Sequence, residues 1–264
     1  MQIRILPNQR RPGVGRRPVP ENRRAWLPQQ ARVCPVLEDA SRIGFLVYPP
    51  LEDREVFQVR RLREEMLRFT FALTGEDGTT RPQWVLDVTS SAGGGGLDAY
   101  DLRFVEEGSA LGEPQVQAQL DVFAVNLNAP PGGVGLRGAF DFVTPRDWDT
   151  VYGGVLNEVQ APHVPVLTAR VETDWYPQPT EFRYVLAPGQ TLSISGSTPV
   201  GQVMFVPRES VELLDGDDAD RASFDERQRS YWTERAAEER VTNFGTVYSY
   251  HYRNEQKARR SSES

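Results

Sequence analysis

The chain of 264 residues has almost no lysine: among its 30 basic residues, only Lys257 is not an arginine. A P-loop needs a lysine directly after its glycines to reach the nucleotide phosphates. Schiff-base chemistry needs a positioned and desolvated lysine. A single lysine close to the end of the chain meets neither need. The sequence therefore argues against P-loop nucleotide hydrolysis and against lysine-dependent covalent catalysis.

Histidine and cysteine are also scarce. The two histidines, His163 and His251, are far apart in the sequence, whereas a cupin-type metal site takes two or three histidines, two of them close together on one strand. Cys34 precedes Pro35 and a short predicted helix, where a lone cysteine is more often a small buried residue than a nucleophile. One cysteine cannot form an internal disulfide, which favours a cytoplasmic location. We expect neither a metal nor a cofactor.

Long apolar runs and a positive net charge are missing too. The apolar runs are short, whereas a membrane-spanning helix needs roughly 20 apolar residues. The formal net charge is −7, and a dedicated nucleic-acid binder needs a basic footprint. We therefore expect neither a membrane span nor a nucleic-acid partner.

Short strand-like segments separated by proline and glycine turns dominate the sequence. Leu67, Phe69, Phe71 and Leu73 alternate with less apolar residues, which is the period of a half-buried strand. Such segments recur at 45–48, 56–60, 67–73, 84–89, 100–105, 116–128, 134–143, 150–156, 164–171, 182–186, 191–194 and 200–206. This pattern predicts a mainly β protein: an antiparallel, jelly-roll-like β-sandwich.

Helices are predicted at two places. Residues 36–42 form a short one that stops at Gly44, and residues 218–241 form a long amphipathic one near the C-terminus. Tyr248, Tyr250 and Tyr252 alternate as on a final strand. We therefore predict a single β-rich domain over residues 33–252, which includes the long helix, and a frayed basic tail over residues 253–264.

Residues 1–32 form an arm rich in arginine and proline, with Glu21 as its one acid. The prolines prevent a continuous helix and favour extended backbone. Two interpretations stay open: a tail that is mobile or wrapped over the surface, and an arm that binds a partner or an acidic surface.

The stretch 171–208 contains the best candidate site. Glu172 and Asp174 lie two residues apart on a predicted strand, so that their side chains share one face. Trp175 and Tyr176 add aromatic area beside a turn with two prolines, and Arg208 ends the stretch. Fixed acids beside aromatic rings are suited to bind a cationic group or a peptide. A purely structural role for a solvated strand end is the alternative.

Three groups of residues resemble an uncharacterised bacterial and phage family, known only as a domain of unknown function. Cys34-Pro35, Gly44-Phe45 and Tyr48-Pro49 resemble its opening, Glu172 to Trp175 its central motif, and Pro199 to Glu209 a later turn. Tyr231-Trp232 with Arg235 is similar to its C-terminal signature. The match covers most of residues 33–240 and implies an architecture without an activity. A looser resemblance, without a shared motif, is to peptide-binding accessory proteins of ribosomal peptide pathways such as crocagin biosynthesis.

The leading functional hypothesis is a non-catalytic accessory protein that binds a peptide or protein partner, with Glu172 and Asp174 selecting basic residues. The first alternative is a metal-free enzyme that uses the same two carboxylates as an acid–base pair. A deep pocket around them favours catalysis, and an open groove favours binding. The second alternative is a virion-type assembly protein, in which the arm wraps a neighbour and forms a homo-oligomer.

Overall fold

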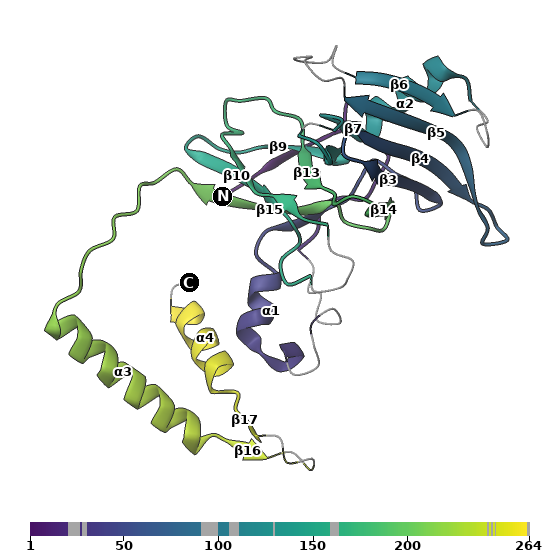
Figure 1. Cartoon of the computed structure of the whole chain (residues 1–264). Helices are drawn as coiled ribbons and strands as arrows, with labels where there is room; N and C mark the ends of the chain where they lie inside the picture. Colours follow the sequence, from purple (N-terminus) through teal and green to yellow (C-terminus); the bar gives the residue numbers. More distant parts are fainter. Residues whose placement is uncertain are drawn as a thin grey trace. The chain divides into compact units, whose positions relative to one another are not determined.

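The computed structural model describes residues 1–20, 27, 31–90, 100–105, 111–128, 130–158, 164–241, 243, 245 and 247–262 (Figure 1). Contacts divide the chain into two compact units. The first unit comprises Met1–Arg32 and Leu37–Arg208, and the second comprises Val33–Val36 and Glu209–Ser264. Each unit is considered by itself below.

A five-stranded antiparallel sheet forms one side of the first unit. Its strand order is β14 (Thr191–Ser195), β3 (Glu55–Arg63), β4 (Met66–Thr74), β5 (Thr80–Ser90) and β6 (Tyr100–Val105). The predicted alternation in β4 is confirmed, because Leu67, Phe69 and Phe71 are buried. Helix α2 (Glu113–Phe123) packs on this sheet through Phe123, whose ring centroid lies 5.2 Å from that of Phe57 and 5.4 Å from that of Phe71.

The described residues of this unit also form two four-stranded sheets and one two-stranded sheet. Their orders are β12 (Ala169–Val171), β10 (Trp148–Gly153), β15 (Gly201–Pro207), β2 (Phe45–Val47); β11 (Val166–Leu167), β13 (Glu181–Val185), β8 (Gly133–Arg137), β7 (Ala124–Val125); and β1 (Arg4–Pro7), β9 (Phe140–Val143). One hydrophobic core takes residues from the different sheets, for example Phe57, Phe182 and Val203. The predicted mainly β, antiparallel fold is confirmed.

The described part of the arm, residues 1–20, lies against the first unit. Strand β1 pairs with β9, and Asn8 Nδ2 donates to Gly138 O at 2.9 Å. Arg11 makes two hydrogen bonds to the buried carboxylate of Glu55, at 2.5 and 2.7 Å. Arg16 Nη2 lies 2.8 Å from Asp53 Oδ1. The acidic surface that these arginines contact therefore belongs to the chain itself.

The short helix predicted at the start of the domain is present in the structure. A 3-10 turn, η2 (Ala31–Val33), precedes helix α1 (Pro35–Ser41). Gly44 then has a φ of +77°, a conformation that glycine adopts without the strain of a Cβ atom. The predicted helix stop at Gly44 is confirmed.

Residues 116–128 were predicted as a strand, and this prediction is wrong. They form most of α2 and then the short strand β7. Val116, Leu120 and Phe123 recur at helical spacing and are all buried. The same stretch also alternates apolar and polar residues, so its pattern fits both periods. Pro114 in the first turn is the signal for a helix start.

The described residues of the second unit include two helices, α3 and α4. Helix α3 (Asp218–Ala237) begins where predicted, with Asp217 Oδ1 accepting a hydrogen bond from Asp220 N at 2.9 Å. The short strands β16 (Arg240–Val241) and β17 (Val247–Tyr248) form a hairpin. Helix α4 (His251–Ser262) follows, and the ring centroid of His251 lies 4.9 Å from that of Tyr231 on α3.

Two predictions for the C-terminus are therefore wrong. The final strand ends at Tyr248, and Tyr252 lies in α4. The tail that was predicted to fray is helical as far as Ser262, because it is rich in Glu, Gln, Lys, Ala and Arg, which are good helix formers. Over the described residues, neither α3 nor any other helix has the length and apolar character to span a membrane.

Candidate functional site

The five predicted site residues come together in the first unit, although not on a strand. Strand β12 ends at Val171, and the chain then turns: Tyr176 N donates to Glu172 O at 2.9 Å and Trp175 N to the same oxygen at 3.3 Å. The prediction that Glu172 and Asp174 lie on a strand is therefore wrong. Their carboxylates still approach each other, because both contact Arg208 at the end of β15.

Arg208 is the centre of this cluster. Its Nη2 donates to Asp174 Oδ1 at 2.7 Å, and its Nε and Nη2 donate to Asp149 Oδ1 at 2.9 and 2.6 Å. Its Nη1 lies 3.4 Å from Glu172 Oε2. The guanidinium thus joins the turn after β12 to strand β10. The carboxylates of Glu172 and Asp174 therefore already have a cation, which the chain itself supplies.

Asp149 is a member of the cluster that sequence reasoning missed. Its side chain is only 2% exposed, and its Oδ2 accepts a hydrogen bond from Arg170 Nε at 2.6 Å. Burial raises its pKa, but the hydrogen bonds from Arg208 and Arg170 outweigh that effect, and the net pKa lies below the usual value. An acid between Trp148 and a strand pattern that begins at Thr150 was the available signal, because an acid that is buried there needs a cation.

Hydrogen bonds among three threonine side chains fix the turn. Thr173 is buried, and its Oγ1 lies 2.7 Å from Thr150 Oγ1 and 3.0 Å from Thr144 Oγ1. Asp147 N donates to Asp174 Oδ2 at 3.1 Å, which adds a further contact. The side chains of Thr173 and Asp174 therefore fix the turn, and this fixes the position of Trp175 and Tyr176, which follow them.

Those residues are Trp175 and Tyr176, whose side chains face solvent. They are 66% and 48% exposed, and their ring centroids are 5.7 Å apart. The indole Nε1 of Trp175 donates to Glu172 Oε2, so Glu172 orients the ring. Adjacent exposed aromatic side chains on a fixed turn form a surface that is suited to contact a partner.

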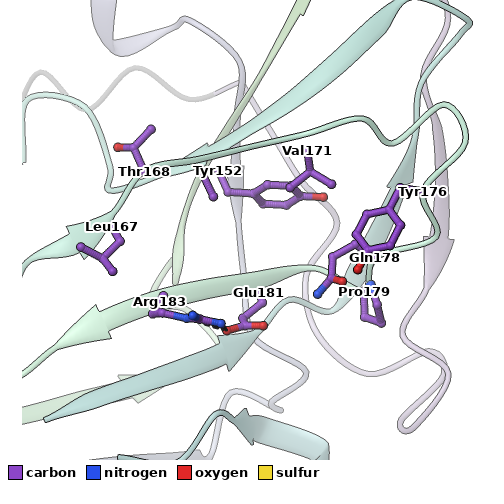
Figure 2. A pocket seen from close by; sticks show the side chains of 10 residues that line it. Tyr152, Leu167, Thr168, Val171, Tyr176, Gln178, Pro179, Glu181 and Arg183 are labelled. Carbon is purple, nitrogen blue, oxygen red and sulfur yellow. Dashed lines mark hydrogen bonds and ion pairs between the residues drawn. The ribbon is translucent and has the colours of Figure 1, made fainter. Parts of the chain in front are cut away.

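A pocket of about 320 Å³ adjoins this turn (Figure 2). It lies where the chain passes from one sheet to another, since Thr168 separates β11 from β12. Its walls include Leu167, Val171, Tyr176 and Pro179, and neither Glu172 nor Asp174 lines it. Figure 2 shows Glu181 and Arg183 side by side at the pocket, and Arg183 Nη2 donates to Glu181 Oε1 at 2.8 Å.

The electrostatics of the cluster disfavour proton transfer by its carboxylates. The hydrogen bond from Arg208 is the main cause that lowers the pKa of Asp174, so this carboxyl stays ionised at neutral pH. A general acid needs a raised pKa instead. Glu172 is committed to Arg208 and to the indole of Trp175.

The other candidate groups lie elsewhere. His163 and the glycine run 93–96 fall outside the described residues, His251 is in α4, and Cys34 is a free, partly buried thiol. Among the residues whose placement is described, no three His, Cys, Asp or Glu side chains are grouped to hold a metal ion.

Comparison with known proteins gives no relative to guide the interpretation: no family model matches the chain, and neither a curated protein nor a solved structure is significantly similar to it. The family resemblance of the Glu172–Trp175 block therefore stays a prediction.

Proposed function

We propose that the protein is a non-catalytic binding protein that recognises a segment of a peptide or protein partner. Trp175 and Tyr176 contact the partner, and the pocket beside Tyr176 accepts one of its side chains. The observation that carries the proposal is the combination of two exposed aromatic rings, a turn fixed by buried groups, and an adjoining pocket that Tyr176 also lines.

The exposed fractions of Trp175 and Tyr176 favour this role. Tryptophan and tyrosine are enriched among the residues that dominate binding energy at protein interfaces. They offer a large contact area and lose little conformational entropy on binding. Because the turn is already ordered by Thr173 and Asp174, ordering the aromatic pair on binding costs little free energy.

Glu172, Asp174 and Arg208 have a positioning role in this proposal. Arg208 provides the cation for both acids, so a basic residue of the partner would have to displace it. The acids therefore hold the turn, and the aromatic rings and the pocket select the ligand. The pocket has a volume at the lower end of the range of small-molecule sites, which suits a single side chain.

Peptide selection tests the proposal. A phage-displayed random dodecapeptide library is selected on the full chain, and the enriched sequences are synthesised and titrated by fluorescence polarisation. The double variant Trp175→Ala/Tyr176→Ala should bind these peptides at least about tenfold more weakly, because truncation of central aromatic residues has an effect of this size or larger.

A matched control is available in the second unit. Trp232 and Tyr250 are also exposed, at 52% and 56%, and Trp232→Ala/Tyr250→Ala should leave the affinities unchanged. Equal affinity of the wild type and the Trp175/Tyr176 variant, or an equal loss in both double variants, would contradict the placement of the binding surface.

A further inference from the structure

A second pocket, of about 530 Å³, lies beside the Gln178–Pro179 segment. Both residues line this pocket and also the pocket beside Tyr176. The second pocket has an apolar part and a charged part. Its apolar walls come from α2 and β7, through Leu120 and Val125. Its charged residues are Arg10 of the arm and Arg137 of β8, together with the acids Asp121 and Glu181.

Arg137 is unusual among the arginines of this unit because it is buried without a hydrogen-bonded carboxylate. It is 8% exposed. Its Nε donates to a main-chain oxygen, Asp121 O, at 3.0 Å, and its Nη2 is 3.5 Å from Asp121 Oδ1. Arg11 and Arg68, by contrast, each make two hydrogen bonds to one carboxylate. Buried charges are normally paired.

The nearby acids are engaged with other groups. The carboxylate of Asp121 forms an ion pair with Arg10. Glu181 Oε1 accepts hydrogen bonds from Asn126 Nδ2 at 2.8 Å and from Arg183 Nη2 at 2.8 Å. The carboxylate of Asp141 is engaged too, because its Oδ1 accepts a hydrogen bond from Thr180 N at 2.7 Å. Arg137 therefore lines the pocket with its charge only partly compensated.

The pKa of Arg137 agrees with this geometry. Burial lowers it, and the neighbouring positive charge of Arg10 lowers it further, while Glu181 and Asp141 act in the opposite direction. An anion that forms hydrogen bonds with the guanidinium would relieve this penalty, because charge-assisted pairs between arginine and carboxylate are strong and frequently bidentate.

We propose that this second pocket binds a carboxylate carried by an apolar residue of the partner, with Arg137 and Arg10 as its hydrogen-bond donors. Leu120 and Val125 contact the apolar part of that residue. The side chain of Asp121 is 51% exposed, so it can turn into solvent when the anion enters. This inference rests on the proposed function, since it specifies which chemical group of the partner is recognised.

Small probes test the inference on the full chain. N-acetyl-leucine carries a free carboxylate and an apolar side chain, and N-acetyl-leucinamide lacks the charge. A glutamate derivative, N-acetyl-glutamic acid α-amide, distinguishes a side-chain carboxylate from a C-terminal one. Ligand-observed NMR titrations should show that N-acetyl-leucine binds the wild type about tenfold more tightly than the leucinamide, and preferential binding of the glutamate probe would contradict the apolar carrier.

Three variants locate the effect. Arg137→Gln should abolish the preference for a carboxylate, and Arg10→Gln, on the surface, should reduce it without affecting folding. Asp141→Asn removes a competing negative charge and should keep or increase the preference. Equal binding of all three probes to the wild type would overturn the inference. An unchanged preference for the carboxylate in both Arg10→Gln and Arg137→Gln would also overturn it. If Arg137→Gln does not fold, the result for Arg10→Gln decides alone.

The two proposals can fail separately. The probes are too small to need the aromatic pair, so Trp175→Ala/Tyr176→Ala should bind them like the wild type. A loss of peptide binding in that variant with no carboxylate preference at Arg137 would leave the proposed function standing and remove only the second pocket from it.

Discussion

At the scale of single residues, arginines paired with buried acids link different segments of the first unit. Arg208 contacts Asp149 and Asp174, Arg68 contacts Asp87, and Arg11 contacts Glu55. The planar guanidinium can bind two acceptors at once, which a lysine ammonium does not do with the same geometry. The cations that pair with these buried acids are therefore all arginines, the residue type that dominates the basic residues of the sequence.

The first prediction concerns Arg208→Ala. The substitution leaves Asp149, 2% exposed, with Arg170 as its remaining cation, and it frees the turn that carries Trp175. We expect a clearly lower melting temperature and weaker peptide binding. Arg146→Ala, at a side chain that is 93% exposed, should change neither. Differential scanning calorimetry measures the stability, and an unaltered melting temperature in Arg208→Ala would contradict the role of the cluster.

The second prediction concerns pH. The pKa values of Asp149 and Asp174 are both lowered in the folded state, so their contribution to stability is complete above the unfolded-state pKa of about 3.9. It is lost as the pH falls through the lower, folded-state values. The wild type should therefore lose stability in acid below about pH 4. The melting temperature of Arg208→Ala should fall less steeply over the same range, and parallel curves would contradict this explanation.

At the scale of elements, a polar contact inside an apolar interface links helix α2 to the sheet. Trp84 is fully buried on β5, and its Nε1 donates to Gln119 Oε1 at 2.7 Å. Phe123 and Phe71 stack beside it. The indole N–H has no access to water, so α2 has to provide the acceptor.

The third prediction uses this contact. Gln119→Leu leaves the indole N–H unpaired and should cost about 1–3 kcal/mol of unfolding free energy. Trp84→Phe removes the donor and creates a small cavity. In the double variant the unpaired N–H is absent, so its loss should be smaller than the sum of the two single losses. Urea denaturation measures all three, and strict additivity would contradict the coupling.

The strands of the first unit could be predicted from the sequence because alternation reports burial directly, as at Leu67, Phe69 and Phe71. Where two periods fit the same residues, as at Val116 and Leu120, the pattern could not decide. The candidate residues Glu172 and Asp174 were identified by their proximity in sequence. Their shared partner Arg208 was named too, but Asp149 and the pocket depend on pairing between β10, β12 and β15, which alternation does not encode.

At the scale of the whole molecule, the arm is a structural part of the first unit. It contributes strand β1, the hydrogen bond of Asn8 and the bidentate pair of Arg11 with Glu55. Leu6, Asn8 and Arg10 also line a pocket of about 310 Å³ next to Pro177. The described part of the arm thus contributes to the structure of the unit, and its Arg10 also lines the second pocket proposed above.

The fourth prediction is that deletion of residues 1–20 destabilises the first unit. The deletion leaves the buried carboxylate of Glu55 without Arg11, and removal of one partner of a buried pair is costly. We expect a melting temperature lower by roughly 5 °C or more. Arg11→Ala should reproduce part of this loss, whereas Arg4→Ala on the exposed face of β1 should not. A deletion variant as stable as the wild type would contradict the structural role.

The fifth prediction concerns the segment between β15 and α3. Val211, Leu213 and Leu214 are 85%, 93% and 81% exposed. Glu212 lies between Val211 and Leu213, and Glu209 lies two residues before Val211. A glutamate-specific protease should cut here first and leave a resistant fragment that contains the first unit. Mass spectrometry identifies the cut, and initial cleavage at a glutamate inside the sheets would contradict it.

The pairing of β1 with β9 also constrains the order of folding. Asn8 bonds to Gly138, 130 residues further along the chain, so the arm is synthesised early but cannot dock until β9 exists. Contacts between residues so distant in sequence form slowly, because closure of a long loop costs entropy before it is compensated. Docking of the arm should therefore be a late event in refolding, and the exposed edge of β9 is open to other strands until then.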